Sequence, residues 1–162
     1  MIDQNIQNLI EEATEESKLT IAGIHPIFLN ELKVDYNDNT KWILEGYIAK
    51  GCITLFSAMY KSGKSTLIRC FLKALQNEEE FLGQPTKKIN ILYISEENAS
   101  IWVEKRDKFE LLDTNIHLIS KPFNVKPTYK EWESFIIDIN AYCIANKIEL
   151  VIIDTLATIL AS

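Results

Sequence analysis

The sequence predicts an α/β fold in which helices flank a mainly parallel sheet, and three observations indicate this class. Stretches typical of strands alternate with stretches typical of helices from about residue 41 onward. The strand stretches are nearly continuous in apolar residues, as expected where both faces of a sheet are covered. Two of them run directly into acidic residues, Glu96-Glu97 and Asp154, at the strand ends where parallel sheets bind ligands.

The N-terminal part is predicted to be a separate helical and linker segment. Apolar residues at helical spacing predict an amphipathic helix to about Ser17, and Pro26 predicts the start of a short helix through Leu32. A polar turn or linker follows. We therefore divide the chain into a segment over residues 1–40 and a core over residues 41–162.

The elements of the core can be predicted in order from their periodicity. The expected extended or strand segments are 41–48, with turns at Gly46 and near Gly51, and then 52–56, 89–95, 116–120 and 148–154, the last of them buried. One helix is expected at 67–77, and a second follows Asn98 and runs to about Glu110. A third begins after Thr128, which is predicted to form a capping box with Glu131. The last helix carries one apolar stripe of Trp132, Phe135, Ile136, Ile139 and Cys143.

Composition excludes several classes of protein. The chain has 162 residues, 47% hydrophobic and 25% charged, which is typical of a soluble globular domain. No apolar run approaches the length of a membrane span, and the N-terminus has no basic region typical of a signal peptide. Cys52, Cys70 and Cys143 show no CxxC spacing, so we expect reduced, buried thiols in a cytoplasmic protein with no membrane partner.

The net charge of −6 limits the expected partners. All charged side chains up to Glu16 are acidic, and the net charge of the remaining residues is close to zero. This balance argues against a broad nucleic-acid-binding surface. It leaves open DNA contact by a few residues or by the central pore of a ring.

Residues 57–66, Ser-Ala-Met-Tyr-Lys-Ser-Gly-Lys-Ser-Thr, predict a phosphate-binding loop between the expected strand 52–56 and the helix from Leu67. Backbone N–H groups of such a loop curl around phosphates, and the helix N-terminus adds partial positive charge. Lys64 can reach the β- and γ-phosphates, and the Ser65 hydroxyl can bind Mg²⁺. The candidate nucleotide-binding residues are Ala58, Met59, Tyr60, Lys61, Ser62, Gly63, Lys64, Ser65 and Thr66.

Three residues of this loop qualify the match. Ala58 stands where the consensus has glycine, and alanine is accommodated there only if φ is negative. Lys61 is not at the position of the second lysine of partition-type ATPases, so we expect a solvated side chain at the outer edge of the loop. Tyr60 could stack on a base or pack against the loop.

The acidic strand ends supply the other groups that phosphoryl transfer needs. Asp154 fits the metal-binding role, because an unpaired carboxylate is costly at the end of a buried strand. A helix-capping aspartate is the alternative. One of Glu96 and Glu97 can polarise the attacking water, but adjacent residues point to opposite faces, so spacing alone leaves the choice open. Both could also be simply solvated.

The segments 42–46, 54–57, 61–66, 92–97 and 151–156 together resemble the RecA-like AAA-type ATPases related to plasmid RepA replicative helicases, which are P-loop NTPases. The resemblance runs from about Trp42 to the last residue. It implies ATP and Mg²⁺ as cofactors, with Lys64 and Glu97 as the catalytic residues and Ser65 and Asp154 as the metal ligands. It also implies a homo-oligomeric ring, such as a hexamer, with single-stranded DNA in its pore. Arg106 resembles an arginine of the family, although a surface salt bridge is the preferred interpretation.

The resemblance also predicts that the core is partial. In RecA-like sheets a further strand lies between the strand ending at Asp154 and the strand of the phosphate loop. That strand, the later sensor residues and any arginine finger are not found before Ser162. Two strands would then lack their shared neighbour, leaving backbone groups unpaired. We therefore expect a fragment or truncated form of a longer ATPase.

The expected function is Mg²⁺-dependent ATP hydrolysis by a RecA-like motor domain in the replication of plasmid, phage or mobile-element DNA. Two alternatives remain open: a regulatory nucleotide switch that does not translocate DNA, and a truncated remnant that binds nucleotide weakly or binds only a partner. A small-molecule kinase lacks support, since no acceptor site or lid is visible in the sequence.

Overall fold

The computed structural model describes residues 28–31, 40–59 and 61–156. The chain divides into two units, Met1–Asn39 and Thr40–Ser162. Within the described ranges, no helix is both long enough and apolar enough to cross a membrane.

The first unit is described only over residues 28–31. A 3-10 helix, Leu29–Glu31, lies there inside the short helix expected from Pro26. The amphipathic helix expected to about Ser17 falls outside the described residues and stays a prediction.

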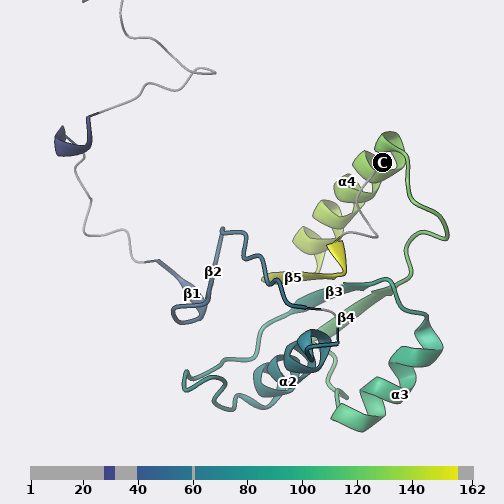
Figure 1. Cartoon of the computed structure of the whole chain (residues 1–162), viewed down its shortest axis with the longest axis horizontal. Coiled ribbons are helices and arrows are strands. Elements are labelled where there is room, and N and C mark those ends of the chain that lie inside the picture. Colours follow the sequence, from purple (N-terminus) through teal and green to yellow (C-terminus); the bar gives the residue numbers. More distant parts are fainter. Residues whose placement is uncertain (1–27, 32–39, 60, 157–162) are drawn as a thin grey trace, which may run out of the picture. The chain divides into compact units, whose positions relative to one another are not determined.

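A parallel sheet of three strands forms the centre of the second unit (Figure 1). In spatial order its strands are β4 (Ile116–Ser120), β3 (Ile91–Ser95) and β5 (Leu150–Asp154). The register pairs Ser95 with Ser120 on one side and with Asp154 on the other, so the three strands end at the same level. The α/β class and the parallel sheet predicted from the alternating pattern are thus confirmed.

Helices cover both faces of this sheet. Figure 1 shows α2 (Lys64–Asn77) and α3 (Ala99–Phe109) on one side and α4 (Tyr129–Ala145) on the other. The two-residue period of β3 divides the core accordingly. Ile91 and Tyr93 pack in the cluster with α2 and α3, whereas Leu92 and Ile94 pack with residues of α4. All five residues of β3 are buried, as a central strand requires.

The start of α4 is the capping box that the sequence predicts. The Thr128 hydroxyl accepts from the Glu131 backbone N–H, and the Glu131 carboxylate accepts from the Thr128 backbone N–H at 2.8 Å. Two backbone donors that would otherwise be exposed at the helix end are satisfied in this way. Residues of the predicted apolar stripe pack against Leu92 and Ile94: Trp132, Phe135, Ile139 and Cys143.

The extended stretch after residue 40 folds as a short antiparallel hairpin. Its strands are β1 (Trp42–Leu44) and β2 (Ile48–Ala49). The turn predicted at Gly46 is present, with a φ of 75° that suits glycine. Leu44 is 2% exposed and joins the core cluster of α2 and α3.

The predicted strand over Cys52–Phe56 is wrong. These residues have no regular secondary structure, and Ile53 is 100% exposed. An apolar run becomes a strand only where a neighbour accepts its backbone hydrogen bonds. Among the described residues no strand pairs with this segment, since the sheet ends at β5. For the same reason β5 is half-buried at a sheet edge, not buried as expected, and its Val151 is 40% exposed.

The expectation of three buried cysteines is also wrong. Cys143 is half-buried in α4, but Cys52 and Cys70 are exposed. Cys52 is the first residue of the irregular segment, and Cys70 lies in α2. All three are free thiols.

Candidate phosphate-binding site

The loop before α2 ends at a glycine in the left-handed region. Gly63 precedes the helix with φ of 90° and ψ of 13°, a left-handed conformation that strains any other residue. The Ser62 N–H donates to the Met59 carbonyl at 3.2 Å, which closes the turn. Gly63 has no side chain to cap the helix, and the first turn holds no acidic residue. The first N–H groups of α2 are therefore suited to an external anion.

The departure from consensus at Ala58 does not strain the loop. Ala58 is not among the residues with positive φ. A Cβ atom is compatible with that backbone, so alanine can replace glycine there. The conformational demand for glycine falls on Gly63 instead. The described part of the loop also includes Lys61, which is exposed and adopts a φ of 59°.

The loop and the ends of β3 and β5 surround one open cavity of about 600 Å³. This volume is in the range of small-molecule sites. All predicted nucleotide-binding residues except Tyr60, which lies outside the described residues, line this cavity. The lining residues are Ala58, Met59, Lys61, Ser62, Gly63, Lys64, Ser65, Thr66, Glu96, Asp154 and Thr155.

Backbone hydrogen bonds hold the two acidic strand ends side by side. The Glu96 N–H donates to the Asp154 carbonyl at 3.1 Å, which continues the β3–β5 ladder by one bond. The Glu97 N–H donates to Ser95 Oγ at 3.1 Å, so the chain turns after β3. Asp154 and Glu96 consequently approach the same cavity from neighbouring strands, as the parallel topology predicts.

The two adjacent glutamates have different surroundings. Glu96 is exposed and lines the cavity, whereas Glu97 is not among the lining residues. The Glu97 carboxylate forms an ion pair with Lys105 of α3, and both side chains are half-buried. The geometry therefore separates two residues that sequence spacing left equivalent.

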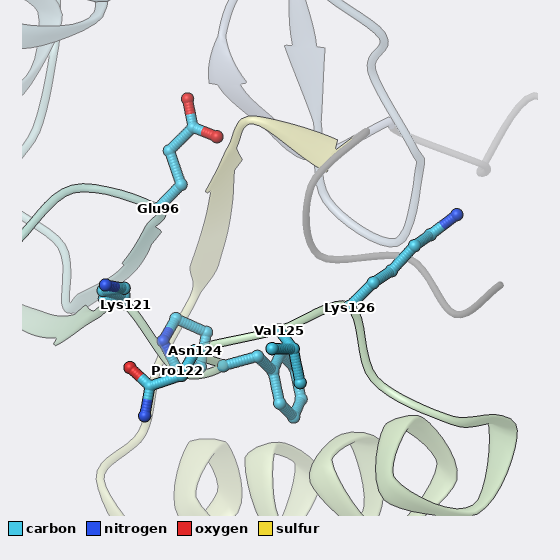
Figure 2. A pocket seen from close by; sticks show the side chains of 7 residues that line it. Glu96, Lys121, Pro122, Asn124, Val125 and Lys126 are labelled. Carbon is cyan, nitrogen blue, oxygen red and sulfur yellow. The ribbon is translucent and has the colours of Figure 1, made fainter.

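A second, smaller hollow of about 230 Å³ borders the first. Glu96 contributes to both, and the remaining lining comes from the loop of residues 121–126 after β4. Figure 2 shows the Glu96 carboxylate on the opposite side of its backbone from Pro122 and Asn124. The Glu96 side chain therefore extends away from this part of the loop.

Tyr93 is a site residue that the sequence analysis missed. Its hydroxyl donates to Asp154 Oδ2 at 2.8 Å. Burial and the negative charge of Asp154 raise the pKa of the Tyr93 phenol, so this group stays protonated at neutral pH. The sequence did offer a signal for Tyr93, since it is a tyrosine within the otherwise aliphatic run before Ser95. A buried tyrosine hydroxyl needs a hydrogen-bond partner, which indicates a polar group nearby.

No protein-family model, no curated protein and no solved structure matches this chain. The site must therefore be judged from its chemistry.

The donors at the cavity fit Mg²⁺ in company with phosphates better than a metal held by the protein alone. In the described part of the chain, no group of three or more His, Cys, Asp or Glu side chains could hold a metal ion. Mg²⁺ typically keeps several waters and needs one or two carboxylates plus substrate phosphates. Ser65 and Asp154, which line the same cavity, suit that arrangement.

The interpretation preferred for Arg106 is met. Arg106 forms a surface ion pair with the neighbouring Asp107 at 2.8 Å. In a separate contact, His117 Nδ1 lies 2.8 Å from the Tyr142 hydroxyl.

Proposed function

We propose that this chain binds ATP with Mg²⁺ and hydrolyses it, as a RecA-like P-loop domain. The observation that carries the proposal is the convergence of the Gly63–Lys64–Ser65 loop, Asp154 and a glutamate on one cavity. Phosphoryl transfer needs a phosphate cradle, a carboxylate at the metal and a group that orients water. These groups lie together although they come from three separate parts of the chain.

Each residue has a role that follows from its chemistry. Lys64 neutralises charge on the β- and γ-phosphates, next to the N-terminus of α2. The Ser65 hydroxyl and the Asp154 carboxylate would hold Mg²⁺, which when bound neutralises the charge developing on the phosphates. The loop orients the phosphates through its backbone N–H groups.

The water-orienting role belongs to one of two glutamates. The family resemblance favours Glu97, whereas the geometry favours Glu96, because Glu96 lines the cavity and Glu97 is paired with Lys105. A general base must reach the attacking water directly or through one further water. On this criterion Glu96 is the better candidate while the ion pair of Glu97 is intact.

The direct test is ATP binding by the chain, measured by calorimetry with Mg²⁺. We expect binding by the wild type and a loss of at least about tenfold in affinity for Lys64→Ala, because a charged contact to phosphate is removed. Lys130→Ala, at an exposed position of α4, is the matched control and should bind normally. Absence of binding by the wild type, or equal binding by Lys64→Ala, would refute the site.

One observation favours the alternative of a nucleotide switch without DNA translocation. The segment before the loop, Cys52–Phe56, is not anchored in the sheet, so the loop is held less rigidly against Asp154 than a strand would hold it. Phosphate release measured with and without single-stranded DNA separates the two functions. DNA-stimulated turnover supports a helicase-like motor that assembles as a ring and acts in plasmid, phage or mobile-element replication. Binding without turnover supports the switch.

A further inference from the structure

Tyr93 contacts Asp154 from inside the core. It lies in β3 with 0% exposure, and its ring packs edge-on against Trp102 with 4.7 Å between ring centroids. Its hydroxyl donates to Asp154 Oδ2 at 2.8 Å. Packing thus fixes the ring, and the ring fixes the direction in which the hydroxyl donates.

The direction of the hydrogen bond follows from ordinary phenol chemistry. A tyrosine hydroxyl holds its proton at neutral pH, whereas a carboxylate has no proton to donate. The Tyr93 hydroxyl therefore donates and the Asp154 carboxylate accepts.

We propose that Tyr93 is a positioning residue for Asp154. It holds the carboxylate through Oδ2 and leaves Oδ1 as the oxygen available to a Mg²⁺ ion that accompanies the nucleotide. Holding a ligand group in place through a hydrogen-bonded partner lowers the cost of ordering it when the metal binds. The inference rests on the proposed function, since it assigns Tyr93 a part in the metal dependence of that site.

The test is Tyr93→Phe, which removes the hydroxyl and keeps the ring. Fluorescent ATP analogue binding is titrated with Mg²⁺ and repeated in EDTA. We expect the half-saturating Mg²⁺ concentration to rise by about tenfold, the lower end of typical effects of such partners. Binding in EDTA should change by less than about twofold, because the phosphate loop is untouched. A role confined to stability would not move the Mg²⁺ dependence of the folded protein.

Tyr142→Phe is the matched control, since its hydroxyl contacts His117 on the other face of the sheet. Its Mg²⁺ dependence should equal that of the wild type. An unchanged Mg²⁺ requirement in Tyr93→Phe would overturn the inference and leave the proposed function standing. Failure of the wild type to bind the analogue would overturn the proposed function, and the inference with it.

A second measurement needs no ligand. The melting temperatures of Tyr93→Phe, Asp154→Ala and the double variant form a cycle that detects the contact in solution. We expect the double variant to melt no lower than the less stable single variant, because Asp154→Ala leaves a buried hydroxyl without its acceptor. Fully additive losses would show that the hydrogen bond does not form, and would overturn the inference.

Discussion

The ammonium group of Lys105 forms an ion pair with Glu97, the residue directly after the glutamate that lines the cavity. Lys105 lies on α3 and also contacts the ring of Trp102, with its Nζ 5.8 Å from the ring centroid. This pair holds Glu97 toward α3, and the proposed function assigns the two acids separate roles.

Substitution of each glutamate should separate those roles. We expect Glu96→Gln to lower ATP turnover by about 100-fold or more with nucleotide affinity retained, since general-base catalysis typically contributes 10² to 10⁴. Glu97→Gln should keep most of the turnover. Phosphate-release assays and binding titrations on both variants check this prediction.

The reverse result has a defined meaning. If Glu97→Gln abolishes turnover and Glu96→Gln does not, then Glu97 acts as the base, as the family resemblance implies. Its ion pair with Lys105 must then break during the cycle, and Lys105→Met should raise the turnover rate. If both variants keep turnover, neither glutamate orients the water.

Gly63→Ala should damage the loop through its backbone. Alanine at a φ of 90° is strained even though a Cβ there would meet no atom within 4 Å. We expect a loss of stability of roughly 1 kcal/mol and weaker ATP binding, because the first turn of α2 must shift. Ala58→Gly is the matched control and should leave affinity within about twofold. Denaturant unfolding and calorimetry measure the two effects, and equal binding by both variants would contradict the prediction.

Leu72→Ala tests whether the face of α2 that carries Leu72 packs in the hydrophobic core. Leu72 is 0% exposed in the cluster that joins α2 to β3, so truncation leaves a cavity. We expect the free energy of unfolding to fall by about 2–5 kcal/mol in urea titrations. Leu112→Ala, at a position 70% exposed, should change it by less than about 0.5 kcal/mol. Similar losses in both variants would mean that α2 does not pack as described.

Because of the capping box at the start of α4, the stability of the fold should depend on pH. The Thr128 backbone N–H and then its hydroxyl lower the pKa of Glu131 below the usual value. A carboxyl with a lowered folded-state pKa stabilises the fold above its unfolded pKa, and this contribution is lost as pH falls through the folded value.

The variant that checks this is Glu131→Gln. We expect it to melt below the wild type at pH 7, and the difference to shrink below about pH 4, where the wild-type carboxyl gains a proton. Glu133→Gln, at an exposed position two residues on, controls for loss of a negative charge on the same helix. A difference in melting temperature that stays constant from pH 7 to pH 3 would contradict the assignment.

Local signals in the sequence predicted most elements, because their causes are local. The Thr128–Glu131 pair marked the start of α4, and the apolar run before Ser95 marked the central strand. The Cys52–Phe56 run has the same local character, yet it is irregular, since a strand also depends on a neighbour elsewhere in the chain. Cys70 was misjudged because helix burial depends on which side meets the sheet.

The site was predictable as a set of residues and not as a set of contacts. The Gly63–Lys64–Ser65 motif was identified from its place between an apolar run and a helix, and Asp154 from its place at the end of an apolar strand. The choice between Glu96 and Glu97 depends on how the chain turns after β3, and the sequence does not specify that turn. Tyr93 was hidden within an apolar run, where only its hydroxyl distinguishes it from a core phenylalanine.

The hydrogen bond between Tyr93 and Asp154 also bears on how the sheet assembles. Strands β3 and β5 are both rich in interchangeable aliphatic residues, which by themselves would tolerate pairing offset by one position. Such an offset would turn the phenol away from its acceptor and bury an unsatisfied hydroxyl, at a cost of roughly 1–3 kcal/mol. One polar contact between strands of aliphatic residues therefore destabilises misaligned folding intermediates. The aligned form is the one that brings Asp154 to the phosphate loop.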